Sequence, residues 1–165
     1  MEFTLRNWQH NDLENLVKYA NNYNIAKNLT NQFPYPYTAE NALGFIKMAM
    51  ADKPTRIFCI AVDNESVGAI GIHPQTDIMC KNAELGYWLG EPFWGNGIIS
   101  KAIKQMLKYG FETFDINRIF ARPFGSNIGS QKALEKAGFA LEARFEKTIF
   151  KYDKFEDELV YAFRR

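Results

Sequence analysis

The segment that decides the fold is residues 83–100, AELGYWLGEPFWGNGIIS, just past the middle of the chain. Its first seven residues form an apolar and aromatic run that is typical of a strand. Gly90 and Pro92 end that strand, because proline cannot donate a hydrogen bond to a central ladder. Residues 94–97, Trp-Gly-Asn-Gly, then lead into the longest helical pattern of the chain. The segment therefore predicts a strand, a glycine-bearing loop and a helix in direct succession.

The helix after this loop is predicted from the spacing of its apolar residues. These residues are Ile99, Ile103, Met106, Leu107, Gly110 and Phe114. We expect that face, including Ile99 at its start, to point into the core. Lys101, Lys104 and Lys108 lie on the opposite face, as expected for a helix face in water.

Before the central segment, the chain alternates helical and strand patterns. A short strand is predicted over residues 3–8 and a helix over 13–20, with Asn11 or Asp12 as its N-cap. Residues 21–37 are irregular, and Thr38 caps a further helix that ends before Lys53-Pro54. Residues 56–62 and 67–72 form a hairpin around the turn Asp63-Asn64.

After the central helix, a strand over 118–121 is followed by a helix over 127–137 that ends at Gly138. Two strands, 139–150 and 158–163, complete the chain as a hairpin joined through residues 152–154. No composition shift or linker marks a boundary, so we expect one domain over residues 1–165. The predicted fold class is α/β (α+β), with a mixed sheet of about seven strands.

Charge and composition exclude several classes of protein. Lys and Arg total 20 against 19 for Asp and Glu, so the net charge of +1 favours neither nucleic acid nor an anionic membrane surface as a partner. No apolar run reaches a membrane span, and the first ten residues do not have the pattern of a signal peptide, so we expect a cytoplasmic protein. Cys59 and Cys80 form no CxxC pair, so we expect two buried thiols and no metal site.

The loop 94–100 is the first candidate for a binding site. Glycines leave backbone amides unobstructed, and the first amides of a helix have no internal partner, so this junction suits a phosphate group. An ordinary glycine-bearing turn is the alternative. Nucleotide-binding motifs do not fit, because GxGxxG after the first strand is absent and no Gly-Lys-Ser/Thr sequence is present.

Three ordered motifs make the chain resemble the GNAT superfamily of acyl-coenzyme A N-acyltransferases, and within it the RimJ/RimL-like ribosomal-protein N-acetyltransferases. Residues 83–89 resemble the fourth strand of that family, 94–99 its pyrophosphate loop, and 127–139 (NIGSQKALEKAGF) its last helix. The resemblance covers the whole chain. It implies a twisted, mostly antiparallel sheet flanked by helices, with the fourth and fifth strands splayed apart.

The resemblance implies acetyl-CoA as the cofactor. Backbone amides at the end of the fourth strand and in the loop would hold it, and the Asn127 amide would bind its pantetheine arm. These cofactor-binding residues are Trp88, Leu89, Trp94, Gly95, Asn96, Gly97, Ile98, Ile99, Ser100 and Asn127. Trp94 and Ile99 depart from the superfamily pattern, in which Arg or Gln often begins the loop and Gly or Ala ends it. Asn127 is alternatively a plain N-cap.

Two side chains are candidates for proton transfer. Glu84 is placed along the cofactor by the resemblance and would accept the proton of the attacking amine, directly or through water. A solvated or ion-paired strand glutamate is the alternative. The helix 127–137 has no tyrosine to serve as the acid, so Ser130 is the candidate donor to the leaving thiolate, with a surface helix residue as its alternative.

The resemblance also implies an acceptor site bordered by the irregular segment 21–37. Its candidate residues are Phe33, Tyr35, Tyr37 and Tyr87, with core packing as the alternative. The expected function is transfer of acetyl to a primary amine, first an N-terminal α-amine of a peptide or protein. A small-molecule amine and a non-catalytic CoA-binding domain are the alternatives, and a monomer or homodimer is expected.

Overall fold

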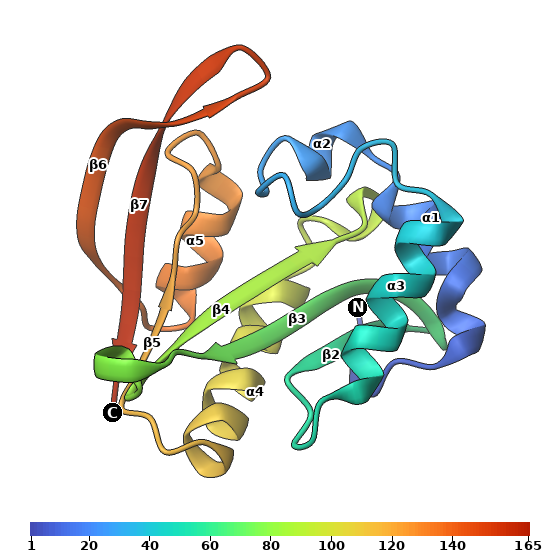
Figure 1. The fold of residues 1–165 in the computed structure, drawn as a ribbon, viewed down its shortest axis with the longest axis horizontal. Coiled ribbons are helices and arrows are strands. Elements are labelled where there is room, and N and C mark those ends of the chain that lie inside the picture. Colours follow the sequence, from blue (N-terminus) through green and yellow to red (C-terminus); the bar gives the residue numbers. More distant parts are fainter. The chain divides into compact units, whose positions relative to one another are not determined.

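A computed structural model describes residues 1–165. Its seven strands follow the hydrogen-bonded order β1-β2-β3-β4-β5-β7-β6, and of the five α-helices three lie between β1 and β2, one between β4 and β5 and one between β5 and β6 along the chain (Figure 1). Only β4 and β5 pair in parallel among the pairs β1-β2, β2-β3, β4-β5, β5-β7 and β6-β7; the others are antiparallel. The predicted mixed sheet of seven strands is confirmed.

The chain divides into two compact units, which we describe separately. The first contains Met1–Gly71 and Tyr87–Ala102, and the second contains Ile72–Gly86 and Ile103–Arg165. The elements β3 (Glu65–Pro74), β4 (Asn82–Leu89) and α4 (Ile98–Thr113) contribute residues to both. One domain over residues 1–165 stays a prediction.

The first unit is built from the N-terminal helices and the strands that they cover. Its remaining elements are β1 (Thr4–Arg6), η1 (His10–Asp12), α1 (Leu13–Ala20), α2 (Tyr23–Ala26), α3 (Ala39–Ala51), β2 (Ile57–Val62) and η3 (Glu91–Phe93). The helices α1 and α3 lie side by side (Figure 1). One buried cluster joins Leu16 of α1, Ile46 of α3, Cys59 of β2 and Ala69 of β3, so the core lies between these helices and one sheet face.

The predicted start of α3 is confirmed by its cap. The Thr38 hydroxyl accepts a hydrogen bond from the Asn41 amide at 3.2 Å, and the Asn41 side chain accepts one from the Thr38 amide at 3.0 Å. This reciprocal pair satisfies amides that the helix itself leaves without partners.

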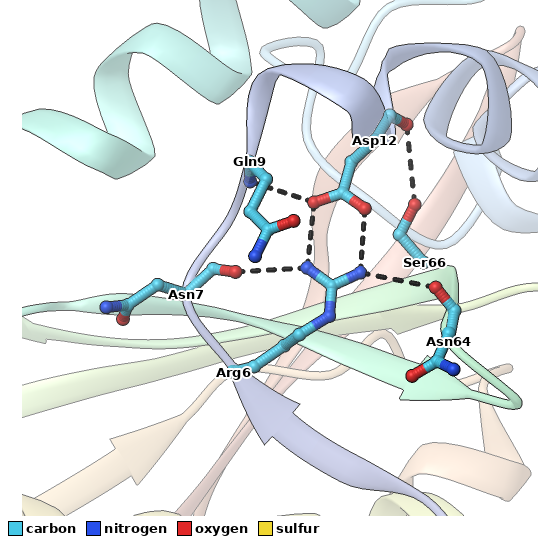
Figure 2. A network of polar contacts seen from close by, with 6 residues as sticks. All are labelled: Arg6, Asn7, Gln9, Asp12, Asn64 and Ser66. Carbon is cyan, nitrogen blue, oxygen red and sulfur yellow. Dashed lines mark hydrogen bonds and ion pairs between the residues drawn. The ribbon is translucent and has the colours of Figure 1, made fainter.

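The predicted N-cap position of α1 is confirmed at Asp12, but its side chain does not cap the helix. The Asp12 side chain makes no capping hydrogen bond to the helix and instead accepts from the Gln9 amide at 2.8 Å and from the Arg6 guanidinium (Figure 2). The hydrogen bond from the Gln9 amide to Asp12 closes a short turn before α1. The Arg6 guanidinium on β1 binds the same carboxylate. This arrangement ties the first strand to the first helix.

The second unit contains the C-terminal strands and one further helix. Its remaining elements are η2 (Asp77–Met79), β5 (Arg118–Ala121), α5 (Ile128–Lys136), β6 (Ala140–Lys151) and β7 (Lys154–Arg164). Gly138 has a φ of +100°, as expected for the residue that ends α5. The strands β6 and β7 form a long hairpin around Tyr152 and Asp153, both with positive φ, so β7 begins four residues before its predicted start (Figure 1).

The two cysteines differ in their surroundings. Cys59 is buried on β2, as predicted. Cys80 is exposed, so the prediction of a buried thiol is wrong there, because it follows the exposed turn η2 instead of lying in a strand. None of the helices combines the length and the hydropathy that a membrane crossing requires.

Candidate functional site

The C-terminal end of β4 is held close to β3 in the first unit. A Cβ atom added to Gly68 of β3 would lie 2.5 Å from the Trp88 carbonyl oxygen, so only glycine fits there. The Gly90 amide donates a hydrogen bond to the Val67 carbonyl at 2.7 Å. The pairing of β4 with β5 ends earlier, at Glu84, whereas β4 continues to Leu89. The splay of the two strands that the family resemblance implies stays a prediction.

The loop after β4 has the backbone conformation that its glycines permit. Gly95 has a φ of +77° and Gly97 a φ of +71°, values that residues with a Cβ rarely adopt. The backbone amides of residues 95–100 donate no hydrogen bond within the chain. They precede or begin α4, a helix of 16 residues whose dipole adds partial positive charge at this end. This arrangement suits an anionic group such as a pyrophosphate.

Polar side chains hold the loop in shape. The Trp94 indole Nε1 donates to the Leu89 carbonyl at 2.7 Å, and the Asn96 side-chain amide donates to the carbonyls of Phe93 and Trp94, both at 3.1 Å. Trp94 is 44% exposed, so it is not part of the core. Its indole instead links the loop to the end of β4, a role that the sequence pattern does not indicate.

The first residues of α4 differ from the sequence expectation by one position. Ile98 is buried, whereas Ile99, the residue predicted to enter the core, is half-buried. The later residues of the predicted face, Ile103, Met106 and Leu107, are buried, so the face is confirmed except at its first residue. Ser100 adds a further contact, since its hydroxyl donates to the Gly97 carbonyl at 3.1 Å.

Two of the predicted acceptor residues pack beside Trp88. The Phe33 ring lies 5.7 Å from the Trp88 ring and 5.1 Å from the Tyr37 ring, measured between centroids. Tyr37 is buried, and burial raises the pKa of its hydroxyl to about 12, so the phenol stays protonated at neutral pH. Tyr35 is exposed and packs its ring against Tyr23.

Tyr87, the fourth candidate, is half-buried on β4. Tyr37 thus packs in the core and Tyr35 is accessible, and the part that these residues play in an acceptor site stays a prediction.

A carboxylate that the sequence analysis missed joins α2 to the turn before the loop. Glu91 of η3 accepts hydrogen bonds from the side-chain amides of Asn22, at 2.7 Å, and Asn24, at 3.1 Å. These bonds, Asn22 first, hold the pKa of Glu91 below its ordinary value. The ring of Phe93, in the same turn, lies 5.3 Å from the ring of Tyr19 on α1. The segment 90–93 is thus anchored to α1 and to the start of α2.

The second unit carries Glu84, and its carboxylate is ion-paired. Arg122, just after β5, donates from Nε to Glu84 Oε1 at 2.9 Å and from Nη2 to Oε2 at 3.2 Å. The hydrogen bond to Glu84 is the main cause that raises the pKa of Arg122. An ion-paired glutamate is the alternative predicted for this position, and the ion pair is present. The catalytic role of Glu84 stays a prediction.

Asn127 and Ser130 lie at the start of α5. The Asn127 side-chain oxygen accepts a hydrogen bond from the Ser130 amide at 3.2 Å, so Asn127 is the N-cap of this helix. Its side-chain nitrogen donates no hydrogen bond within the chain. Gln131 fixes the preceding turn through the Gly125 carbonyl, at 3.0 Å. Ser130 is half-buried. Binding of the pantetheine arm by Asn127 and proton donation by Ser130 stay predictions.

The candidate residues fall into two groups. The first unit brings together the loop 94–100, Trp88, Leu89, Phe33 and Tyr37. The second unit holds Glu84, Asn127 and Ser130. Lys101, Lys104 and Lys108 are all exposed on α4, as expected for a solvated helix face. No group of three or more His, Cys, Asp or Glu side chains is arranged to hold a metal ion.

Comparison with known proteins gives a consistent result. Residues 2–140 match the family described as "Acetyltransferase (GNAT) domain". The chain is 29% identical over 107 residues to the ribosomal-protein-serine acetyltransferase of Escherichia coli (strain K12), covering 65% of this chain and 59% of that relative. The match thus spans less than two thirds of the relative's length.

Solved structures share the fold over nearly the whole chain. An acetyltransferase (GNAT family) from Bacillus anthracis has a TM-score of 0.85 at 25% identity and covers 99% of this chain and 95% of its own. The ribosomal alpha-N-protein acetyltransferase RimL, solved in complex with coenzyme A, has a TM-score of 0.82 at 21% identity, with coverage of 98% and 93%. At 21% identity, the likeness to RimL concerns the fold alone. With the family match over residues 2–140, the resemblance seen in the sequence is confirmed, and the chain belongs to the GNAT acetyltransferase family.

Proposed function

We propose that the protein is an N-acetyltransferase that transfers the acetyl group of acetyl-CoA to a primary amine. The observation that supports it most directly is the loop 95–100, whose amides donate no hydrogen bond within the chain and whose two glycines have positive φ. Such a loop at the start of a long helix would hold the pyrophosphate without requiring a basic side chain. Because the chain belongs to the GNAT family, we expect the anion that this loop binds to be the pyrophosphate of acetyl-CoA.

Further residues would orient the rest of the cofactor. The Asn127 side-chain nitrogen is available to the pantetheine arm, and the Trp88 or Leu89 amide would donate to the thioester oxygen. When bound, acetyl-CoA supplies a thioester whose acetyl carbon accepts the amine while the carbon–sulfur bond breaks.

Two side chains would handle the protons. Glu84 would accept the proton of the amine nitrogen, directly or through water, so that an N–H bond breaks and an O–H bond forms. Ser130, directly or through water, would supply the proton that the leaving sulfur takes up. Solvent then takes the proton from Glu84 and returns one to Ser130. Both groups regain their starting states, so the number of protons is unchanged.

The acceptor we propose is an N-terminal α-amine of a peptide or protein. An α-amine with a pKa of about 7.8 is roughly one-seventh neutral at pH 7, whereas a lysine amine with a pKa near 10.4 is neutral only about once in 2,500. A site with one candidate carboxylate and no other evident base suits the α-amine, because less proton removal is required. The E. coli relative named a ribosomal-protein-serine acetyltransferase supports the same choice.

A competition experiment tests the proposal. Acetyl-CoA is offered with N-terminally free peptides, N-blocked lysine peptides, polyamines and aminoglycosides, and the products are identified by mass spectrometry. We expect release of the CoA thiol and acetyl groups on the α-amines. Acetylation of lysine side chains or small amines alone would contradict the α-amine acceptor, and binding of acetyl-CoA without thiol release would favour a CoA-binding sensor.

A further inference from the structure

The pair formed by Arg122 and Glu84 has the geometry of an oriented carboxylate. Two nitrogens of one guanidinium donate to the two oxygens of the carboxylate, at 2.9 and 3.2 Å. A bidentate contact of this kind fixes the plane of the carboxylate, which a single hydrogen bond does not do. Each carboxylate oxygen can accept about two hydrogen bonds, so one position on each remains for water or an amine.

The fold explains why the two side chains meet. Glu84 pairs with Phe120 in the parallel ladder of β4 and β5, and Arg122 follows Phe120 by two residues. Side chains two residues apart point to the same face of a strand. Ala83 and Leu85 of β4 alternate with Glu84 and are buried on the other face. The sheet register therefore directs Arg122 and Glu84 to one polar face.

The backbone that carries Arg122 is held on its C-terminal side by β7. The Leu159 amide donates to the Pro123 carbonyl at 3.0 Å, and the Gly125 amide donates to the Asp157 carbonyl at 2.8 Å. The position before a proline is also restricted to extended conformations. The backbone next to Arg122 is thus held in place, as a positioning residue requires.

The charge of a second carboxylate acts on the same guanidinium. Glu158 of β7 contributes to the raised pKa of Arg122 through its charge, after the hydrogen bond and the charge of Glu84. Arg122 therefore stays positively charged at neutral pH. The hydrogen bonds go to Glu84 alone, which makes Glu84 the carboxylate that Arg122 orients.

Stability does not explain this contact well. The side chains of Arg122 and Glu84 are 46% and 27% exposed, and ion pairs this accessible to water contribute little to folding. Arg164, whose side chain is 65% exposed, pairs with Glu142, which also accepts from Arg118, so Arg164→Ala is the control for loss of an exposed, ion-paired arginine. Removing either arginine should leave the folded state nearly unchanged.

We propose that Arg122 is a positioning residue that holds the Glu84 carboxylate in the orientation in which it accepts the amine proton. This inference rests on the proposed function. Without Arg122 the carboxylate rotates among several conformers, of which only one meets the amine. Turnover would fall, whereas affinity for acetyl-CoA would not change.

A double-mutant cycle in the full-length protein tests this role. We expect Arg122→Ala to lower kcat about 10- to 100-fold, the range for a misplaced catalytic group, with an unchanged KM for acetyl-CoA. Arg122→Lys should recover part of the loss, because it keeps the charge without the planar fork. In a Glu84→Gln background, Arg122→Ala should have no further effect, and the control Arg164→Ala should match the parent.

A measurement without substrate completes the test. The Arg122 Nε–H resonance in a nitrogen-15 NMR spectrum should be protected from exchange in the parent and lose that protection in Glu84→Gln. Independent losses in the double mutant, or an equal loss in Arg164→Ala, would overturn the positioning role. So would a parent-like kcat for Arg122→Ala, whereas an inactive parent protein would contradict the proposed function itself.

Discussion

The Arg6 guanidinium donates two hydrogen bonds to the Asp12 carboxylate, at 2.9 Å from Nη1 and 2.7 Å from Nη2 (Figure 2). The Asp12 side chain is only 5% exposed, and that of Arg6 is 25% exposed. Burial alone would raise the pKa of Asp12, but the hydrogen bonds from Arg6 and from the Gln9 amide outweigh it and hold that pKa below its ordinary value. The carboxylate is therefore ionised in the folded protein at neutral pH.

The first prediction concerns acid stability. Because the pKa of Asp12 is lowered by folding, its contribution is present above the unfolded value of about 4 and disappears as the pH falls through the folded pKa. Asp12→Asn should cost about 2–4 kcal/mol at pH 7, since it leaves Arg6 without its partner. In urea unfolding the difference between the two proteins should shrink below about pH 4.

The control for this experiment is Asp115→Asn, at a carboxylate whose side chain is 93% exposed. It should leave the free energy of unfolding nearly unchanged. A difference between Asp12→Asn and the parent that persists undiminished at pH 2 would contradict the ion-pair explanation.

The second prediction concerns the thiols. Burial raises the pKa of Cys59 to about 12, so almost no thiolate forms at pH 8, whereas Cys80 is exposed. A thiol reagent should therefore modify one cysteine rapidly in the folded protein and both in guanidinium chloride. Cys80→Ser should remove the rapid reaction. Rapid modification of Cys59 in that folded variant would show that β2 opens readily.

Local patterns were sufficient for most elements of the fold. The turn Asp63-Asn64 has positive φ at both residues, Thr38 caps α3, and Gly138 ends α5, each as its residue type indicates. These features depend on neighbours in the sequence, which is why they can be predicted. The predicted apolar face of α4 is likewise confirmed at Ile103, Met106 and Leu107, but in the first turn, which follows the path of the loop, Ile98 and not Ile99 is buried.

The candidate site was predictable only in part. The loop 94–100 can be found from its two glycines between a strand and a helix. Arg122 cannot, because its contact with Glu84 joins residues 38 positions apart and depends on the register of β4 with β5. The packing of Phe33 on Trp88 likewise needs the tertiary structure, since no spacing in the sequence relates the two rings.

The third prediction tests the loop. Gly97 has a φ of +71°, and a β-branched side chain would force the backbone out of this region and turn the neighbouring amides away. Gly97→Val should lower affinity for acetyl-CoA at least about 100-fold in calorimetry, equivalent to ~2.7 kcal/mol. Gly138→Ala places a side chain at a φ of +100° at the end of α5 and serves as the control for backbone strain. Unchanged affinity in a folded Gly97→Val protein would remove the loop from the binding site.

The fourth prediction concerns Glu84. Glu84→Gln keeps the size of the side chain but cannot accept a proton, so turnover at pH 7 should fall about 10²- to 10⁴-fold. The loss should be smaller at pH 9, where more of the amine is already neutral. Affinity for acetyl-CoA, measured by calorimetry, should not change. Equal turnover of the variant and the parent from pH 6 to 9 would assign Glu84 a structural role only.

The last prediction uses the contact between β3 and the end of β4. A Cβ at Gly68 would lie 2.5 Å from the Trp88 carbonyl oxygen and 3.1 Å from the Leu89 Cα, and both are backbone atoms that cannot move independently of the strand. At Gly86, two residues before Trp88 on β4, an added Cβ would meet no atom within 4 Å. The two glycines therefore form a matched pair, one closely packed and one open.

Gly68→Ala should push the end of β4 away from β3 and cost about 1–3 kcal/mol in urea unfolding, as overpacking does. The displacement moves Trp88, Leu89 and, through the indole of Trp94, the loop that follows. Affinity for acetyl-CoA should therefore fall about tenfold or more, ~1.4 kcal/mol. Gly86→Ala should keep both the stability and the affinity of the parent. A Gly68→Ala protein that is destabilised but binds acetyl-CoA like the parent would show that the cofactor does not depend on the position of the Trp88 and Leu89 backbone.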